Sequence, residues 1–462
     1  MTREMRFDHL IHGDLVLPDR VLPDGWVAIA GETIAAIGTG EPPDAAATHD
    51  HRGRFVLPGL VDGHMHTSSH TGWEGIAGAT RSAAAGGITT VCDMPYDTPR
   101  SVMDAETLNA KIEAANRHAH IDVSLYATVR KSGGLAEVAR MAALGCTAFK
   151  LSTFEVDAVR FPRIDHAEMR EAFEEIARTG RMAAIHNEDQ EIVARLISEA
   201  KARGETGPEQ HAATRPVLAE RLANLAVFEL GLATGCHVHL AHSSLAVGFD
   251  QAAATRAAGG RTTAETCLHY LCMTDDALLT HPGIAKCNPP FRTEAEVEGS
   301  WDALLAGRVA YISTDHAPWP LARKRFTGDI FAVGAGLTGL QTLAPLLYTL
   351  LARRGLSVTL MARYAAERPA RYHGIFPKKG ALMPGADADL CILAPGAFRF
   401  DAARIEDREE HRWSLWDGME MAARVAETWS RGRRVWDGVQ VLAEPGDGRF
   451  QPRLSDAPVA LG

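Results

Sequence analysis

Hydrophobic and polar positions follow two different patterns along the chain. In its middle, apolar runs rich in β-branched residues are separated by stretches with helical spacing, such as 105–119, 166–179 and 217–234. Eight apolar runs occur: FVLPGLVDGH, ITTVCDM, IDVSLYAT, CTAFKLS, RMAAIHN, HVHLAHS, RTTAETC and VAYISTD. Eight buried strands that alternate with helices favour an α/β fold, a (β/α)₈ TIM barrel, over an open doubly wound sheet. No G-x-G-x-x-G follows the first run, so a dinucleotide-binding fold is not expected.

The two ends of the chain show the second pattern, in which short apolar runs are broken by Gly, Pro and Asp. This pattern covers residues 7–57 and about 381–440 and is typical of a small sheet domain. We therefore expect residues 1–57 and 381–462 to form one discontinuous β-sandwich domain beside a barrel of residues 58–380. The alternative is two unrelated terminal extensions. The last twelve residues, QPRLSDAPVALG, predict a loose tail.

Composition and charge exclude several classes of function. The 462 residues include 48 Lys and Arg against 58 Asp and Glu, a formal net charge of −10, and no dense basic run occurs. Nucleic acid and anionic membranes are therefore not expected as partners. The seven cysteines include no C-x-x-C pair, and the N-terminus lacks the apolar stretch of a signal peptide. These features predict a cytoplasmic protein with free thiols.

Two histidines and a lysine stand near the ends of apolar runs. His64 and His66, at i and i+2 on a strand, point to the same side and could both bind one metal ion. Two structural histidines would have the same spacing. Lys150 lies in the fourth run, where a buried ammonium is costly unless it is paired or chemically used. Its candidate roles are a Schiff base, a salt bridge, carbamylation to an anionic metal ligand, or a simple position at the rim.

Three further runs end in residues that can bind a metal or move a proton. They are His186 after the fifth run, His242 after the sixth and Asp315 after the eighth. Barrel enzymes place their chemistry at the C-terminal ends of the strands. Any single one of these residues could be a core histidine or a helix cap. Together with the first and fourth runs, however, they predict one active site.

These motifs resemble the amidohydrolase superfamily, and within it the cyclic amidases: allantoinases, dihydropyrimidinases (hydantoinases) and dihydroorotases. The resemblance covers nearly the whole chain, and it rests on the order of the blocks VLPGLVDGHMH, GGITTVCDMP, FKLS, HVHLAHSS, NPPFR, STDHAP and KGALMPGADADLCIL. It implies a metal-dependent hydrolase that opens a ring amide or ureide by attack of a hydroxide bridging two metal ions. The motifs are most similar to those of allantoinases.

By position, the resemblance implies a binuclear metal centre. The implied ligands are His64, His66, Lys150, His186, His242 and Asp315. The first two histidines would bind one ion and the other two the second, with a carbamylated Lys150 bridging both. Asp315 would also ligate the first ion and act as the catalytic proton shuttle. Zinc is the expected metal, and iron, manganese, cobalt or nickel could occupy the same ligands. His237 and His239 would be structural or would support the metal ligands from behind.

The residues at substrate-binding positions narrow the substrate. Dihydroorotases hold a carboxylate with an Arg, an Asn and a His, where this chain has Ser68, Tyr96 and Trp319. Hydantoinases usually have a tyrosine where this chain has Glu155. The segment 73–90, WEGIAGATRSAAAGGITT, matches allantoinases closely, although the loop before it is about two residues shorter. The implied substrate is a small uncharged cyclic amide or ureide, with allantoin as the leading hypothesis.

Other functions remain open alternatives. They are a hydantoinase-, dihydropyrimidinase- or dihydroorotase-like hydrolase of another cyclic imide, ureide or lactam, a mononuclear deaminase, and a non-catalytic dihydropyrimidinase-related scaffold. Asn288 stands where the family touches the substrate ring, and it could pair with a ureide edge or form an Asx turn. Relatives are commonly homodimers or homotetramers. The segment 319–336 could be a lid over the site or a rim loop.

Overall fold

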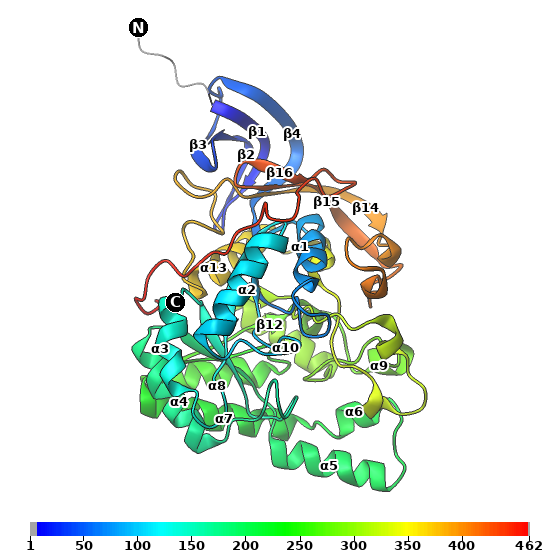
Figure 1. Cartoon of the computed structure of the whole chain (residues 1–462). Coiled ribbons are helices and arrows are strands. Elements are labelled where there is room, and N and C mark those ends of the chain that lie inside the picture. The colour runs from blue at the N-terminus through cyan, green and yellow to red at the C-terminus, as the bar shows by residue number, and fades with distance from the viewer. Residues whose placement is uncertain (1–6, 461–462) are drawn as a thin grey trace.

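The computed structural model describes residues 7–460. Residues 1–6 of the expected N-terminal segment and residues 461–462 of the expected tail lie outside the described residues. In Figure 1 the middle of the chain surrounds a central bundle of strands, and strands from both ends of the chain lie together at the top of the view.

A ring of parallel strands forms the centre of the protein. Its strands are β5 (Leu60–Met65), β6 (Ile88–Asp93), β7 (Asp122–Ala127), β8 (Ala148–Ser152), β9 (Met182–His186), β10 (His237–Leu240), β11 (Arg261–Ala264), β12 (Thr266–Cys267) and β13 (Ile312–Ser313). β5 to β11 pair in chain order, β12 continues the course of β11, and β12 pairs with β13. A parallel bridge between Met65 and His316 closes the ring. The predicted barrel is confirmed, and each of the eight apolar runs occupies one strand position around the ring.

Every residue of β5 to β10 is buried. Strands covered on both faces carry continuous apolar runs instead of an alternating pattern, which is why these segments stand out in the sequence. Polar groups within such strands must be hydrogen-bonded or used chemically, because an unpaired buried polar group is costly.

Helices lie around the ring (Figure 1). They are α1 (Gly75–Ala85), α2 (Ala105–His118), α3 (Leu135–Ala143), α4 (His166–Arg178), α5 (Gln190–Ala202), α6 (Gln210–Ala213), α7 (Val217–Thr234), α8 (Ala246–Ala257), α9 (Asp276–Thr280), α10 (Glu294–Leu305), α11 (Leu343–Arg353), α12 (Thr359–Ala362) and α13 (Arg368–Tyr372). Aspartates fix several starts: the side chains of Asp104, Asp165 and Asp189 accept backbone N–H groups of the first turns of α2, α4 and α5. The three stretches with helical spacing correspond to α2, α4 and α7.

Strands from both ends of the chain form one seven-stranded sheet. Its order is β16-β15-β14-β4-β1-β2-β3. The strands are β1 (Phe7–Val16), β2 (Val21–Ala30), β3 (Thr33–Thr39), β4 (Ala45–Pro58), β14 (Leu390–Arg399), β15 (Glu420–Ser430) and β16 (Arg433–Trp436). β14 pairs antiparallel with β4, so the two ends share one sheet and are not separate extensions.

The expected loose tail is wrong for its first residues. Gln451 and Arg453 are buried, and the Gln451 backbone N–H donates to the Val123 carbonyl at 2.8 Å. The Arg453 guanidinium donates to the Gly180 carbonyl at 3.2 Å. These partners lie near the starts of barrel strands β7 and β9, so the tail is fastened across the end of the barrel opposite the strand C-termini.

Two further expectations concern thiols and membranes. All seven cysteines are free, as expected, and all but Cys272 are buried. Within residues 7–460, no helix has the length and apolar character needed to cross a bilayer.

Candidate metal centre

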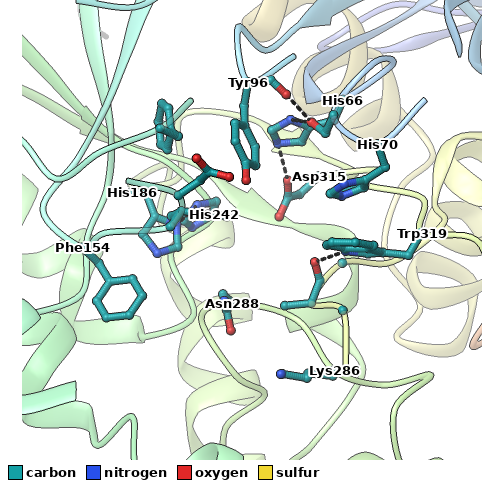
Figure 2. Close-up of a pocket in the computed structure, with 18 of the residues that line it drawn as sticks. His66, His70, Tyr96, Phe154, His186, His242, Lys286, Asn288, Asp315 and Trp319 are labelled. Carbon is teal, nitrogen blue, oxygen red and sulfur yellow. Dashed lines mark hydrogen bonds and ion pairs between the residues drawn. The ribbon is translucent and has the colours of Figure 1, made fainter. Parts of the chain in front are cut away.

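The C-terminal ends of the barrel strands surround a pocket of about 420 Å³. Every residue singled out as a metal ligand, proton shuttle or ring contact lines it: His64, His66, Lys150, His186, His242, Asn288 and Asp315. They come from β5, β8, β9, and the segments after β10, α9 and β13, and several of them are labelled in Figure 2. The structure therefore brings together residues that lie up to about 250 positions apart in the sequence.

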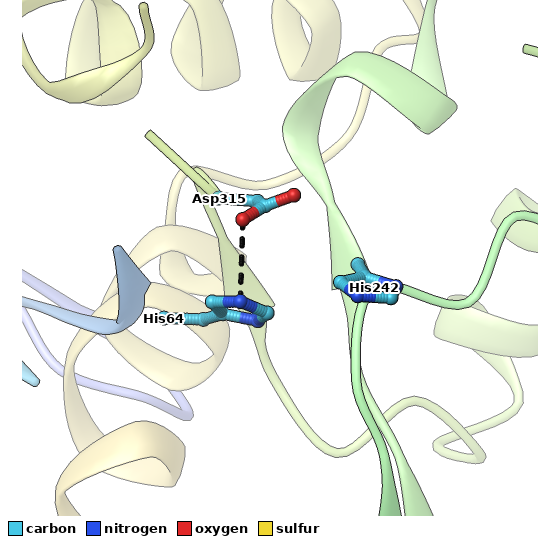
Figure 3. A group of neighbouring side chains, drawn as sticks. All are labelled: His64, His242 and Asp315. Carbon is cyan, nitrogen blue, oxygen red and sulfur yellow. Dashed lines mark ion pairs between the residues drawn. The ribbon is translucent and has the colours of Figure 1, made fainter. Parts of the chain in front are cut away.

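One half of the cluster is built around the Asp315 carboxylate. Its Oδ1 lies 3.2 Å from His64 Nε2 and 3.5 Å from His66 Nε2. His64, His242 and Asp315 each offer one ligand atom, and these atoms lie within 4.8 Å of one another (Figure 3). Two imidazoles and a carboxylate at such distances could bind one divalent metal ion.

The other half is a pair of facing imidazoles. His186 Nδ1 lies 3.0 Å from His242 Nε2.

The backbone of His242 and of Asp315 is left-handed, with φ of 39° and 45°. Residues other than glycine rarely adopt this conformation, and strain of this kind is concentrated at functional sites.

Two ligand atoms are buried without a hydrogen-bond or ion-pair partner among the described residues. They are Lys150 Nζ and His242 Nδ1. Buried polar atoms are nearly always hydrogen-bonded, so two such atoms without a partner in one pocket indicate a missing partner. Four imidazoles with a carboxylate suit zinc and similar divalent ions. The residues present therefore fit a metal centre.

Burial and neighbouring charges set the protonation of the cluster. Burial lowers the pKa of Lys150 to about 8. Burial and then the Lys150 charge hold the pKa of His242 well below its usual range, so its imidazole is neutral, as a metal ligand must be. Burial alone would raise the pKa of Asp315, but the nearby His64 and His66 outweigh it and hold this pKa well below the usual range. Asp315 is thus an ionised acceptor.

The outer nitrogens of three ligand histidines have partners that the sequence did not reveal. His64 Nδ1 lies 2.5 Å from Glu265 Oε1, and His186 Nε2 lies 2.9 Å from Glu188 Oε2. His66 Nδ1 lies 2.9 Å from the Ser69 hydroxyl. Such contacts fix the ring orientation and direct the other nitrogen to the pocket. Glu265 stands where the seventh apolar run stops, the same signal that identified the other ligands.

Comparisons with known proteins show the family of this chain. Residues 55–435 match the profile of the Amidohydrolase family. The chain is 35% identical over 430 residues to an allantoinase of Rubrobacter xylanophilus, an alignment that covers 92% of this chain and 93% of the relative. The chain belongs to the amidohydrolase family. Among solved structures, this amidohydrolase is similar to the L-hydantoinase (dihydropyrimidinase) of Arthrobacter aurescens, with a TM-score of 0.92 and 29% identity over 97% of this chain and all of that one. A D-hydantoinase matches with a TM-score of 0.88, 26% identity, and coverage of 96% and 99%.

Other candidate residues of this amidohydrolase lie outside the cluster. His237 Nε2 and His239 Nδ1 each lie 2.8 Å from the Thr263 hydroxyl and do not line the pocket, in agreement with a structural role. Glu155 is exposed, and its backbone N–H donates to the Gln190 side chain. Its neighbour Phe154 lines the pocket instead.

The segment 319–336 of the amidohydrolase forms one wall of the pocket. Trp319, Arg323 and Phe331 are among its contributions. Lys324 is fully buried, and its ammonium donates to the backbone carbonyls of Lys286, Gly334 and Gly336 at 2.7 to 3.0 Å. These bonds tie the segment to the loop that carries Asn288, so in this structure the segment is a closed wall.

Proposed function

We propose that this amidohydrolase opens a ring amide or ureide in a metal-dependent reaction, with allantoin as the leading substrate and allantoate as the product. The observation that carries the proposal is the convergence of six candidate metal ligands and Asn288 on one pocket. The similarity to allantoinases and hydantoinases supports the class of substrate. The alternative is a hydantoinase-, dihydropyrimidinase- or dihydroorotase-like hydrolase of another cyclic imide, ureide or lactam. Retention of all six ligand positions disfavours a non-catalytic scaffold.

The six residues would hold two divalent ions, with zinc the expected metal. His64, His66 and Asp315 would hold one ion. His186 and His242 would hold the other, and Lys150 would bridge both as a carbamate, formed when its neutral amine adds to carbon dioxide and releases a proton to solvent. Two such ions supply a water of lowered pKa and polarise the substrate carbonyl. Burial of Lys150 favours the neutral amine that carbamylation needs.

Asp315 is the proposed proton carrier. Its Oδ1 faces the imidazoles of His64 and His66, which leaves Oδ2 to take a proton from the attacking water and deliver it to the leaving ring nitrogen. The low pKa of Asp315 keeps the carboxylate ionised before the reaction. Asn288 Oδ1 is buried without a partner among residues 7–460, so it can accept a ring N–H while its amide donates to a ring carbonyl.

The proposal extends to the whole protein. Residues 1–57 and 381–462 would form a β-sandwich domain and residues 58–380 the catalytic barrel, a division supported by the shared sheet of the two ends. We propose a homodimer or homotetramer that acts in the cytoplasm, by analogy with the family.

The test combines metal analysis with a substrate screen. Elemental analysis should find two metal ions per chain. The metal-loaded protein should open one or more of allantoin, hydantoins, dihydrouracil, dihydroorotate and simple imides. The product distinguishes the classes, because ring opening yields an acid and a deaminase would release ammonia. A native protein without bound metal, or one inert toward the whole panel, would contradict the proposal.

The bridging role is tested by Lys150→Ala. We expect this variant to lose more than about 100-fold in kcat/KM, since even groups that only orient metal ligands contribute 10- to 100-fold. Short carboxylic acids should restore part of the activity by replacing the carbamate. The matched control is His237→Asn, because His237 lies on β10 near His242 but contacts Thr263 instead of the pocket. Normal activity of metal-replete Lys150→Ala would exclude the bridge.

A further inference from the structure

Two buried cations line the pocket beyond the metal ligands. Arg215 and Lys286 are each 6% exposed. The Lys286 ammonium donates to the backbone carbonyls of Ile330 and Val333, both at 2.7 Å. No carboxylate pairs with it among the described residues, and an ammonium has three N–H donors. Lys286 therefore keeps one N–H donor available to the pocket.

Arg215 has more N–H donors without a partner than Lys286 has. Its only side-chain hydrogen bond within residues 7–460 is a long one, 3.5 Å from Nη1 to Glu188 Oε1, and its Nε has no partner. The other Glu188 oxygen already contacts His186. The guanidinium carbon lies 5.0 Å from the centre of the Phe154 ring, within the range of a cation–π contact. A guanidinium has five N–H donors, so most of those of Arg215 are unused.

A second arginine of the pocket shows the contrast. Arg160 donates to the Asp157 carboxylate, the Ser69 carbonyl and the hydroxyls of Thr98 and Tyr96, at distances of 2.6 to 3.1 Å. The N–H donors of Arg160 are therefore already hydrogen-bonded to residues of the pocket wall. Arg215 is more deeply buried than Arg160, yet its side chain makes only the one long hydrogen bond to Glu188 among the described residues. Buried donors without partners point to a ligand.

Arg215 and Lys286 act on each other. Burial and then the Arg215 charge lower the pKa of Lys286 to about 7. Glu188 partly compensates Arg215 at 3.5 Å, but no carboxylate among the described residues pairs with Lys286, so an acceptor that reaches both groups would reduce their repulsion. In Figure 2, Lys286 lies beyond Asn288, on the side away from Asp315. A ring held by Asn288 would therefore direct its substituent, and not its reacting amide, toward Lys286.

We propose that Arg215 and Lys286 form a donor subsite that binds an oxygen acceptor on the substituent of the substrate ring. A carboxylate and a ureido carbonyl offer the same chemistry, since each presents an oxygen that can accept from both cations. The inference rests on the proposed ring-opening function. It also revises the expectation of an uncharged substrate, because an acidic substituent would meet two partly unpaired cations.

The test compares three hydantoins that differ only in the substituent at ring carbon 5. Allantoin carries a ureido group, hydantoin-5-acetate a carboxylate, and 5-isobutylhydantoin an alkyl group. The metal-loaded, full-length protein should have a kcat/KM at least about 10-fold higher for one of the two oxygen-bearing rings than for the alkyl ring, because a site built to donate hydrogen bonds discriminates against analogues without the acceptor. The order of allantoin and hydantoin-5-acetate identifies the acceptor.

Variants assign the preference to the two cations. Arg215→Gln and Lys286→Met should each reduce the ratio of kcat/KM between the oxygen-bearing and the alkyl ring by about 10-fold, and Lys286→Arg should restore part of it. Arg323→Gln is the control, because Arg323 also lines the pocket but is exposed and stacks on Trp319. Equal kcat/KM for all three rings in the unmodified protein, or an unchanged ratio in both variants, would overturn the subsite.

A binding measurement separates failure of the subsite from failure of the proposed function. If none of the hydantoins is opened, ring opening is the part in error. The subsite then predicts that calorimetry of the zinc-loaded protein finds tighter binding of N-carbamoylaspartate or allantoate than of N-carbamoylleucine, with the difference lost in Arg215→Gln. Equal affinities would overturn the subsite independently of catalysis.

Discussion

At the scale of single residues, Glu265 connects two of the candidate metal ligands. It contacts His64 Nδ1 and also accepts the backbone N–H of His242 at 3.1 Å, so one carboxylate links ligands from β5 and from the end of β10. Burial alone would raise the pKa of Glu265, but the charge of His64 outweighs it and lowers this pKa. Glu265 therefore remains ionised in a fully buried position.

Glu265→Gln keeps the size and removes the charge. We expect a 10- to 100-fold loss of metal affinity or activity, the usual effect of removing a carboxylate that orients a metal-binding histidine. Competition with a chelator measures the affinity for zinc. Glu298→Gln is the control, because Glu298 pairs with Arg354 on the surface. Unchanged zinc affinity in Glu265→Gln would show that His64 is held by its backbone alone.

The position of a residue relative to its strand decides what the sequence could predict. Lys150, His186 and Asp315 were identifiable because each interrupts or ends an apolar run, and the barrel brings all such ends to one rim. Glu265 follows β11 directly and obeys the same rule, although it is not among the residues that the motifs predict. Arg215 and Lys286 reach the pocket from loops, and the course of a loop leaves no periodic signal in the sequence.

At the scale of elements, Glu427 connects three strands of the terminal sheet. From β15 it contacts His51 of β4 at 3.4 Å, Arg434 of β16 at 3.0 Å and the Trp429 indole N–H at 2.8 Å. Burial raises the pKa of Glu427, but His51, Trp429 and Arg434 outweigh it and lower the pKa to about 2. A carboxylate with a depressed pKa stabilises the folded state above its unfolded pKa, and this contribution is lost as the pH falls toward 2.

Glu427→Gln should lower the free energy of unfolding at pH 7 by roughly 1–2 kcal/mol, the range for a hydrogen-bonded charged group at a half-buried site. The difference from the unmodified protein should shrink between about pH 4.5 and pH 2. Urea unfolding at pH 7, 4.5 and 2.5 measures it. Glu420→Gln, at the exposed start of β15, should change little at any pH. A difference that is constant with pH would assign the effect to packing.

The local sequence pattern predicts where helices and strands lie better than it predicts which distant residues they contact. Helical spacing located α2, α4 and α7 to within a residue of their ends, because an amphipathic helix records its buried face in the sequence. The C-terminal tail has no such periodic pattern of apolar residues. Gln451 and Arg453 are held by groups near Val123 and Gly180, more than 250 residues earlier in the chain.

At the scale of the whole molecule, a buried ionic cluster joins the barrel to the terminal sheet. Lys379 is fully buried, and its ammonium lies 2.5 Å from Asp122 at the start of β7, 2.8 Å from Asp387 and 2.9 Å from Asp389, which precedes β14. Asp122 also accepts the Arg449 backbone N–H at 2.9 Å. One lysine thus links the barrel, the sheet and the C-terminal segment.

Lys379→Met tests whether the two parts of the molecule unfold as one unit. The three carboxylates would lose the cation that they share, which leaves Asp389 without a cation among the described residues and Asp122 with only the more distant Arg431 at 3.5 Å. Removing one partner of a buried ionic group costs about 3–5 kcal/mol of unfolding free energy. The neighbouring variant Lys378→Met is the matched control: Lys378 pairs with Asp387 but is 37% exposed, so its loss should cost less than about 1 kcal/mol. Denaturant unfolding followed by tryptophan fluorescence and by circular dichroism measures both variants.

If the ionic cluster couples the barrel to the terminal sheet, Lys379→Met should also separate the fluorescence and circular dichroism signals into distinct transitions, because the sheet would lose its link to the barrel. A cost as small as that of Lys378→Met, with one shared transition, would mean that the apolar contacts between sheet and barrel suffice to hold them together.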